Sequence, residues 1–369
     1  MNTPIRRIAI STGGGDAPGL NAVISSVVWA AANRGWDCLG IRDGFNGILM
    51  PERYPQGGVE RLTRERVRGI SHLGGTILGT TNKGNPLRFP TRQGDGSLAE
   101  VDRSQEILDY CRREGIDALV MAGGDGTLAI GHALQSRGLR VIGVPKTIDN
   151  DLDRTHTTFG FDTAVAFATE CLDRLHSTAE SHQRVMVVEV MGRYAGWIAL
   201  HAGIAGGAHA ILMPEIPYDI EAVAAAVRER DAHGRAYALV VVAEGAQARE
   251  GQRAVLAPAA AGQVERLGGI GEQVAQALAQ RTGKDARAVV LGHLLRGGSP
   301  TSFDRIAAKR FGTAAVRGLA QGLSGVMVAL SHPNVVYVPL AEVAGRMKAV
   351  PADSDTLQTA RDLGICLGE

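Results

Sequence analysis

The sequence of 369 residues has few cysteines, few aromatic side chains and almost no net charge. Its four cysteines are scattered and form no CxxC pair or Cys/His cluster with zinc-ligand spacing, which argues against a disulfide framework or a structural zinc site. The 39 Lys and Arg residues nearly cancel the 38 Asp and Glu residues, so the chain has no overall field for nucleic acid or an anionic membrane. Any anion site must therefore be local.

Long apolar runs are also missing. No run reaches the roughly 20 residues that span a bilayer. The start, MNTPIRRIAI, leads directly into an expected strand and lacks the apolar region and cleavage site of a signal peptide. With 45% hydrophobic and 21% charged residues, the chain is not expected to be disordered. These features predict a cytoplasmic protein with two domains or one large α/β body.

Glycine, by contrast, is abundant, with 48 residues and no collagen-like period. Short apolar runs end in Gly, Pro or Asp clusters and are followed by Ala-rich stretches, which is typical of parallel βαβ units. We predict strands at 7–11 and 185–190 and a helix at 20–33, with Pro18 in its first turn. The pattern favours two interleaved α/β lobes.

Three segments depart from this alternation. The Arg-rich stretch 82–104 is expected to be a mobile loop, and Ser104 is expected to cap the helix that follows it to Arg113. Residues 246–268 are expected to form an irregular insertion. The tail after Pro351 predicts one short helix.

Two Gly-rich clusters each stand between a predicted strand and a predicted helix. Residues 11–19 read STGGGDAPG and residues 123–127 read GGDGT. Glycines there let backbone N–H groups approach phosphate oxygens at the positive end of a helix, and Asp125 can bind Mg²⁺ directly or through water. The first cluster is neither a dinucleotide-binding GxGxxG nor a Walker A motif. Either cluster could instead be a structural turn. In the second cluster, Asp125 would then be a helix cap.

A third cluster, PKTIDND at 145–151, follows the strand predicted to end at Val144. We expect Asp149 and Asp151 to lie on the same side of an extended chain, where a cation or a shared proton would relieve their repulsion. One carboxylate can then deprotonate a substrate hydroxyl while the other orients Mg²⁺ or Lys146. A surface turn is the alternative.

The fourth cluster, GHLLRGGSP at 292–300, contains His293 and Arg296. A helical first turn would let both grip one phosphate, although His293 alone could be a core residue. Further arginines stand beside predicted strands, at Arg184, Arg193 and Arg287. Several cations beside glycine turns suit a phosphorylated small molecule, so the residues predict Mg²⁺-dependent phosphoryl transfer to a phosphorylated acceptor.

Seven ordered motifs from Gly13 to Arg305 resemble those of the 6-phosphofructokinase family. They are GGGDAPGLN, GGDGT, PKTIDND, TFGFDTA, SHQRVMVVEVMGRYAGW, VVAEG and LGHLLRGGSPTSFDR. The resemblance implies two Rossmann-like three-layer α/β/α lobes and a glycolytic phosphotransferase that converts fructose 6-phosphate to fructose 1,6-bisphosphate. The implied domains are a donor lobe at 1–160 plus about 295–345, a sugar-phosphate lobe at about 161–294 and a C-terminal extension at 346–369.

The resemblance also implies a role for each site residue. Asp149 would accept the proton of the 1-hydroxyl group, Thr147 would contact the transferring phosphoryl group, and Arg193 completes the catalytic set. Asp125 and Asp151 would lie near Mg²⁺. The implied donor-binding residues are Gly15, Asn82, Lys83, Gly124, Asp125, Gly126 and Thr127. The implied substrate-binding residues are Thr147, Ile148, Asp149, Arg184, Met191, Gly192, Arg193, Glu244, Arg287, His293, Leu294, Leu295 and Arg296. Arg184 and Arg287 would cross to a neighbouring site in a homodimer or homotetramer.

Two positions bear on the phosphoryl donor. Pyrophosphate-dependent members of the family usually carry Asp where this chain has Gly126 and Lys where it has Lys146, whereas typical bacterial ATP-dependent members have Gly at both. This mixed pair resembles the mixed-substrate group III. An Asp at 126 would repel the α-phosphate of ATP, and Phe45 could stack on the purine. We therefore expect ATP as co-substrate, with pyrophosphate as the alternative.

The sequence departs from the family pattern at further positions. Asn82 followed by Lys83 replaces an Arg on the transferring phosphoryl group, so Lys83 is expected to supply that charge. Ser25, Trp29 and His176 replace the effector-site arginines of allosteric bacterial enzymes, which argues against the usual control by ADP or phosphoenolpyruvate. An NAD or lipid kinase sharing only GGDGT, and a non-catalytic sugar-phosphate-binding regulator, are the other classes left open.

Overall fold

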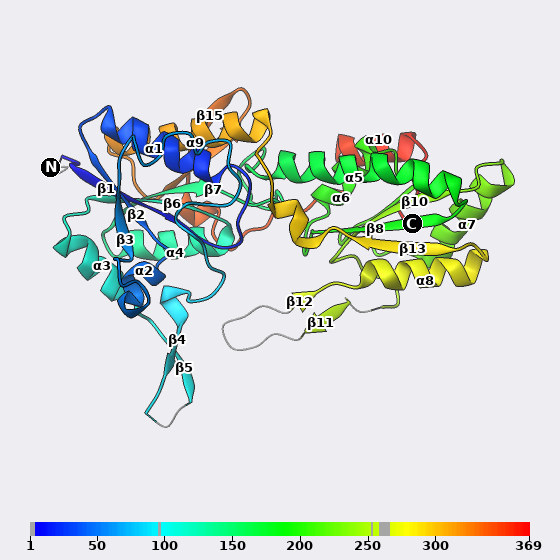
Figure 1. Ribbon diagram of the computed structural model, residues 1–369, viewed down its shortest axis with the longest axis horizontal. Helices are drawn as coiled ribbons and strands as arrows, with labels where there is room; N and C mark the ends of the chain where they lie inside the picture. The colour runs from blue at the N-terminus through cyan, green and yellow to red at the C-terminus, as the bar shows by residue number, and fades with distance from the viewer. Residues whose placement is uncertain (1–3, 95–96, 252–253, 258–265) are drawn as a thin grey trace.

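The computed structural model describes residues 4–94, 97–251, 254–257 and 266–369. These residues form two α/β lobes, each with a largely parallel sheet between two layers of helices (Figure 1). The N-terminal end lies in the larger lobe and the C-terminus in the smaller one. The predicted α/β class with three-layer lobes is confirmed.

The larger sheet has seven strands in the order β15-β14-β7-β6-β1-β2-β3. They are β1 (Arg7–Thr12), β2 (Asp37–Ile41), β3 (Val59–Leu62), β6 (Ala118–Gly123), β7 (Arg140–Pro145), β14 (Val326–Ser331) and β15 (Asn334–Pro339). The inner strands pair in parallel, and β3 and β15 add antiparallel edges. The carboxyl ends of β1, β6 and β7 therefore meet at one edge, where ligands bind in open α/β sheets.

Helices cover both faces of this sheet. One face carries α1 (Leu20–Ala32) and α9 (Ser302–Ala320), and the other carries α2 (Asn46–Leu49), α3 (Ser104–Arg113) and α4 (Asp125–Ser136). Successive strand side chains point to opposite faces. Ile8 and Ile10 pack in one core and Ala9 in the other, so β1 reads as a continuous apolar run.

The smaller sheet is entirely parallel, in the order β13-β8-β10-β9. Its strands are β8 (Val185–Val190), β9 (Ala210–Leu212), β10 (Ala238–Ala243) and β13 (Ala286–Val290). Helices α5 (Phe161–Ser181), α6 (Trp197–Ala205) and α10 (Asp355–Asp362) cover one face, and α7 (Ile220–Ala232) and α8 (Ile270–Thr282) cover the other. The short helix predicted in the tail is α10, and it packs on α6.

The stretch 82–104 is more regular than expected. It contains a 3₁₀ turn η2 (Pro86–Arg88) and the hairpin strands β4 (Phe89–Arg92) and β5 (Leu98–Val101), which project from the larger lobe (Figure 1). The Phe89 ring is buried, with the Arg103 guanidinium 4.8 Å from its centroid. The described residues of this stretch therefore form a paired hairpin packed at Phe89, and not a loop without regular structure.

The insertion at 246–268 lies partly outside the described residues. Its described part holds the antiparallel pair β11 (Val255–Ala257) and β12 (Arg266–Leu267). The described residues also contain the short elements η1 (Pro51–Arg53), η3 (Gly292–Arg296) and η4 (Leu340–Glu342). The chain passes between the lobes after β7, after η3 and after η4, and these passages bring the two carboxyl edges together.

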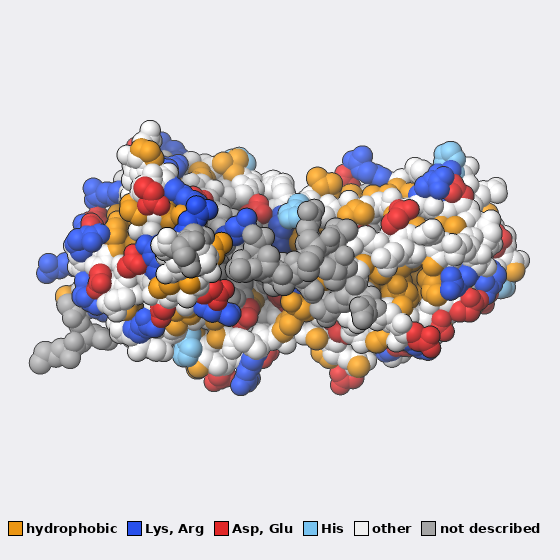
Figure 2. Space-filling model, turned by 90° about the horizontal axis from the view of Figure 1, so that it is seen from below, with side chains coloured by type: hydrophobic (Ala, Val, Ile, Leu, Met, Phe, Trp, Pro, Cys, Tyr) orange, Lys and Arg blue, Asp and Glu red, His pale blue; other side chains and the backbone are white. Residues whose placement is uncertain are grey.

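The face of the molecule that Figure 2 shows agrees with the balanced charge of the sequence. Viewed from below, Lys and Arg side chains are interspersed with Asp and Glu and do not form one field, and the molecule narrows between the lobes (Figure 2). Among the helices that the structure describes, none is both long and apolar enough to span a membrane.

Candidate active site

The Gly-rich turns after β1 and β6 lie side by side. Gly13 donates its backbone N–H to the Ala122 carbonyl at 3.0 Å. A Cβ at Gly13 would lie 2.6 Å from the Thr127 hydroxyl oxygen, so this close approach requires glycine. A Cβ at Gly126 would meet nothing within 4 Å, so this position faces open space at the first turn of α4. The structure thus brings the two predicted donor clusters into one cradle, with Gly124 as the residue before α4.

Lys146 enters this cradle from the end of β7. Its backbone N–H donates to the Gly123 carbonyl at 3.0 Å, and its ammonium group donates to the Gly15 carbonyl. The side chain is buried, and burial lowers the pKa of Lys146 to about 8, with the nearby Arg296 charge adding to the effect. A buried ammonium group that still carries its proton at neutral pH is placed to face an anion.

Asp149 lies two residues beyond Thr147, where the chain leaves the larger lobe. Its backbone N–H donates to the Thr147 hydroxyl at 3.1 Å, and its Oδ1 is buried without a hydrogen-bond partner among the described residues. Burial raises the pKa of Asp149 to about 7, the Asp151 charge adds to this, and Arg296 and Lys146 oppose it. A carboxylate with this pKa and an unsatisfied oxygen can accept a proton near neutral pH.

The chain between Asp149 and Asp151 is not extended. Asn150 has a left-handed backbone with φ of 52°, and its Oδ1 accepts a hydrogen bond from the Thr158 N–H at 3.1 Å. The expectation of an extended chain is therefore wrong, because the short polar Asn side chain can hold this conformation. The two charges still interact, since Asp151 contributes to the raised pKa of Asp149.

Asp125 and Asp151 are the carboxylates that fit a divalent cation. Burial raises the pKa of Asp151, and the Asp125 charge contributes, so the two groups are close enough to repel each other. Asp125 is exposed, and its Oδ1 accepts the Gly345 N–H at 2.7 Å. Across the described ranges, no group of three or more His, Cys, Asp or Glu could enclose a metal ion. Two carboxylates suit Mg²⁺, which usually shares its coordination with water and substrate phosphate.

The predicted sugar-side residues gather after β8 and β10. Gly192 has φ of 142°, a conformation that favours glycine, and its carbonyl accepts the Gly245 N–H at 3.1 Å. Burial raises the pKa of Glu244, while the Arg193 charge and a hydrogen bond from the Gly192 N–H oppose this shift. The Met191–Arg193 turn and Glu244 therefore lie together at the carboxyl edge of the smaller sheet.

Arg296 connects the two lobes. Its Nη1 donates to the Asp16 carbonyl at 3.0 Å, and a Cβ at Gly15 would lie 2.7 Å from the same nitrogen. Its charge opposes the raised pKa of both Asp149 and Glu244, so it lies near carboxylates from both lobes.

The other residues of η3 are placed differently. His293 and Leu294 are exposed, whereas Leu295 is buried in the core of the smaller lobe together with Ile148. Only Arg296 of this turn therefore reaches the cradle in the described chain.

Arg184 and Arg287 lie at the opposite edge of the smaller sheet. Both pair with Asp285, at N···O distances of 3.2 and 2.7 Å. Arg184 precedes β8 and Met191 follows it, so the strand separates them by roughly 20 Å at about 3.3 Å per residue. These arginines cannot join the sugar-side cluster of their own chain.

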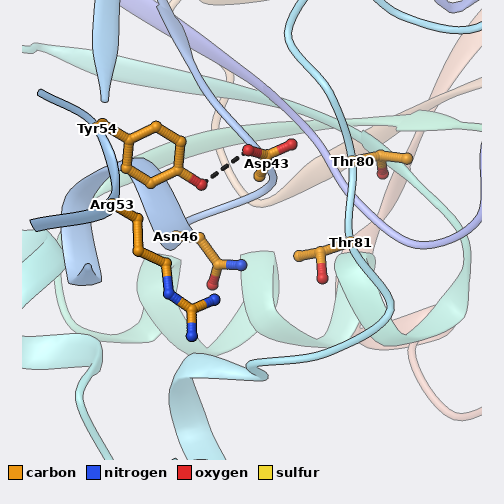
Figure 3. A pocket seen from close by; sticks show the side chains of 6 residues that line it. All are labelled: Asp43, Asn46, Arg53, Tyr54, Thr80 and Thr81. Carbon is orange, nitrogen blue, oxygen red and sulfur yellow. Dashed lines mark hydrogen bonds between the residues drawn. The ribbon is translucent and has the colours of Figure 1, made fainter. Parts of the chain in front are cut away.

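A pocket that sequence reasoning missed opens beside the cradle. Its volume is about 360 Å³, and it is lined by Asp43, Asn46, Arg53, Tyr54, Thr80 and Thr81 (Figure 3). The Tyr54 hydroxyl donates to Asp43 at 2.7 Å, and the Thr80 hydroxyl donates to the Gly14 carbonyl at 2.6 Å. No motif marks these residues, because they come from two segments that are separate in the sequence, 43–54 and 80–81.

Phe45 does not line this pocket. Only 5% of its surface is exposed, and it packs in the hydrophobic core with Ile41 and Phe89. The expectation that it stacks on a purine is wrong in this structure, because the ring is part of the core. Asn82 and Lys83 are exposed at the rim, where the Lys83 N–H donates to the Thr81 hydroxyl at 3.0 Å.

Comparisons with known proteins agree on one family. Residues 7–319 match the family model described as phosphofructokinase. A protein of Chloroflexus aggregans named ATP-dependent 6-phosphofructokinase is 51% identical over 100% of this chain and 99% of its own length. A protein of Amycolatopsis mediterranei named pyrophosphate–fructose 6-phosphate 1-phosphotransferase is 48% identical over 94% of this chain and 97% of its own.

The solved structures include a chain of the same fold. Phosphofructokinase of Pichia pastoris in the T-state has a TM-score of 0.78 and 29% identity. The match covers 98% of this chain and 37% of that longer one.

Proposed function

This chain belongs to the phosphofructokinase family, and on that basis we propose that it is an ATP-dependent 6-phosphofructokinase that acts in glycolysis in the cytoplasm. The observation that carries the proposal is the position of Asp149. Its Oδ1 is buried without a hydrogen-bond partner among the described residues, and its carboxyl group interacts with the charges of Lys146 in the cradle and of Arg296. The Arg296 charge also acts on Glu244 of the other lobe. A base placed between a phosphate cradle and a cationic sugar site suits transfer of a phosphoryl group to a hydroxyl.

Asp149 is the proton acceptor of this reaction. The 1-hydroxyl oxygen of fructose 6-phosphate forms a bond to the terminal phosphorus of ATP, and the bond from that phosphorus to the bridging oxygen of ADP breaks. The hydroxyl proton passes to the Asp149 carboxylate. Thr147, whose hydroxyl accepts the Asp149 N–H, holds the base and contacts the transferring group.

The cradle holds the donor by charge and by backbone N–H groups. Lys146 and Arg296 supply fixed positive charge, and Lys83 at the rim adds to it, so little reorganisation is needed as charge moves onto the leaving group. Asp125 and Asp151 would hold Mg²⁺, which when bound neutralises negative charge on the donor phosphates.

The pocket beside the cradle supports a nucleotide donor. Its volume of about 360 Å³ falls in the range of small-molecule sites, and its polar lining suits a ribose or a base. Gly126 leaves space where a carboxylate would repel an α-phosphate. Pyrophosphate remains the second candidate, since Lys146 suits either donor and a relative named for pyrophosphate is 48% identical.

The smaller lobe binds the sugar phosphate. Met191, Gly192, Arg193 and Glu244 line its carboxyl edge, and the Arg296 charge reaches Glu244 from η3. The exposed His293 of the same turn is assigned to the sugar phosphate as part of this proposal. Arg184 and Arg287 complete the site of a neighbouring subunit in a homo-oligomer, because they lie too far from the site of their own chain. We assign the donor lobe to 1–160 plus about 295–345, the sugar lobe to about 161–294 and the extension to 346–369.

Product analysis tests this function. The purified chain is incubated with fructose 6-phosphate, ATP and Mg²⁺, and phosphorus NMR identifies the sugar phosphates formed. We expect fructose 1,6-bisphosphate and ADP, and no product from a folded Asp149→Ala variant. Near-normal turnover in that variant would overturn the assignment of the base.

A further inference from the structure

We infer that Lys348 in the C-terminal extension is a positioning residue, which holds the loop of Asp149 in its reactive geometry and ties it to the sugar-binding lobe. This role rests on the proposed function. Lys348 lies 199 positions along the chain from Asp149, and no motif marks it.

The Lys348 ammonium group donates all of its hydrogen bonds to this loop. It donates to Asn150 Oδ1 at 3.0 Å, to the Thr155 carbonyl at 3.0 Å and to the His156 carbonyl at 3.1 Å. An ammonium group has three N–H donors, so these acceptors account for all of them. The site is largely removed from water, and this burial lowers the pKa of Lys348 to about 8. The three hydrogen bonds take the place of water around the ammonium group.

The backbone of the extension follows the same loop. The Lys348 N–H donates to the Asp151 carbonyl at 2.8 Å, and Met347 forms an antiparallel bridge with Leu152. Asn150, between the two aspartates, is left-handed with φ of 52°. Such a conformation is unfavourable for a non-glycine residue and persists only where the surroundings enforce it. Lys348 supplies one of the two hydrogen bonds that the structure gives to the Asn150 oxygen.

The other side of Lys348 faces the smaller lobe. Its carbonyl accepts the indole N–H of Trp197 at 2.9 Å, and its ammonium nitrogen lies 5.5 Å from the Trp197 ring centroid. Trp197 begins α6, four residues after Arg193. Two residues further along, the Val350 N–H donates to Glu215 at 2.8 Å, and Glu215 also accepts the Gly196 N–H at 3.0 Å.

The extension therefore connects the loop that carries the base to the turn that carries Arg193. Phosphoryl transfer depends on in-line alignment of the two substrates, and a misplacement of about 1 Å can cost about 10²-fold in rate. A residue that fixes both elements acts on turnover without touching either substrate.

The test compares Lys348→Met with Lys284→Met. Lys284 is a matched control because its ammonium group is also largely buried, donates to the Ala236 carbonyl at 2.9 Å and pairs with Asp231 at 2.6 Å. It lies at the edge of the smaller sheet away from the site of its own chain. Its ammonium group contacts Asp231 and Ala236, whereas Arg184 and Arg287 pair with Asp285. Steady-state kinetics with ATP and fructose 6-phosphate, melting temperatures and hydrogen–deuterium exchange of residues 146–158 are measured for each protein.

We expect Lys348→Met to lower kcat by about 10-fold to 10²-fold with KM changed by less than about threefold, and to accelerate exchange at 146–158. Lys284→Met should keep kcat within about twofold even if its melting temperature falls equally. The Asn150→Ala substitution should lower kcat less in the Lys348→Met variant than in the wild type. The reason is that each substitution alone already removes the same hydrogen bond between Lys348 and Asn150.

Four results would overturn the inference. They are an unchanged kcat in Lys348→Met, unchanged hydrogen–deuterium exchange at 146–158 in Lys348→Met, an equal loss of kcat in Lys284→Met, and kcat losses that simply multiply in the double variant. A wild-type protein without turnover would instead remove the proposed function. In that case hydrogen–deuterium exchange at residues 146–158 still decides whether Lys348 holds the loop. An exchange rate in Lys348→Met equal to that of the wild type would overturn this role.

Discussion

Replacing Asp149 by Asn should stabilise the protein while abolishing turnover. The Asp149 pKa is raised from 3.8 to about 7, mainly by burial, so ionising this carboxyl group opposes folding. A group with a raised acid pKa is favoured in its protonated form, and the cost of ionising it grows as the pH rises from about 4 to about 7 and is complete above that. The Asn amide has nearly the same shape and no charge, so it avoids this cost.

The magnitude follows from the pKa shift. Raising the pKa of Asp149 from 3.8 to about 7 makes ionisation oppose folding by about 4 kcal/mol at pH 8, and the same linkage gives about 2 kcal/mol at pH 5. For a chain of 369 residues that unfolds cooperatively, the unfolding entropy is about 0.8 kcal/mol per kelvin. Asp149→Asn should therefore melt roughly 5 °C above the wild type at pH 8 and roughly 2 °C above it at pH 5.

Differential scanning calorimetry at the two pH values measures this difference. Asp173→Asn is a suitable control, because Asp173 is exposed on α5 in the same lobe as the sugar-side turn, and it should not change the melting temperature at either pH. In parallel, wild-type kcat/KM should fall tenfold per pH unit below about 7, since the base must be ionised. An Asp149→Asn variant that is no more stable than the wild type at pH 8, or equally stabilised at both pH values, would refute the reasoning.

Two further predictions concern the donor and the neighbouring subunit. Gly126→Asp should lower kcat/KM for ATP by about 10²-fold, since a carboxylate about 5 Å from a phosphate charge costs about 3 kcal/mol at an effective dielectric of about 20. Gly126→Ala should remain near wild type, because a Cβ there meets nothing within 4 Å, and equal losses in the two variants would exclude charge as the cause. Arg287→Glu should raise KM for fructose 6-phosphate, and reassembly of mixed Arg287→Glu and Asp149→Asn subunits should restore part of the activity. Absence of recovery in verified hybrid oligomers would contradict a crossing Arg287.

The sequence predicts best the strands that are buried on both faces of a sheet, because burial on both faces favours an apolar side chain at nearly every position. The strand predicted at Val185–Val190 matches β8, because helices cover both faces of the smaller sheet and every side chain of this strand is buried. The first helix begins at Leu20 and ends at Ala32, so Pro18 precedes it instead of lying in its first turn. Asp102, and not Ser104, provides the side-chain oxygen at the start of α3, where it accepts the Ser104 N–H at 2.9 Å.

The candidate site was predictable where glycine and charge mark the ends of parallel strands, since those ends must meet at one edge. It was not predictable where the burial or the backbone conformation of a residue depends on contacts with residues far away in the sequence. Phe45 is buried because the hairpin at 89–101 brings Phe89 against the same core. Asn150 is left-handed beside a lysine 198 residues away, and no local pattern carries that information.

The choice of donor is the most direct test of the proposed function. Steady-state rates should be measured with ATP and with pyrophosphate, each with fructose 6-phosphate and Mg²⁺, on the same preparation. We predict efficient turnover with ATP and little or none with pyrophosphate, because Gly126 leaves the cradle open and a pocket of about 360 Å³ lies beside it. Activity confined to pyrophosphate would contradict the account.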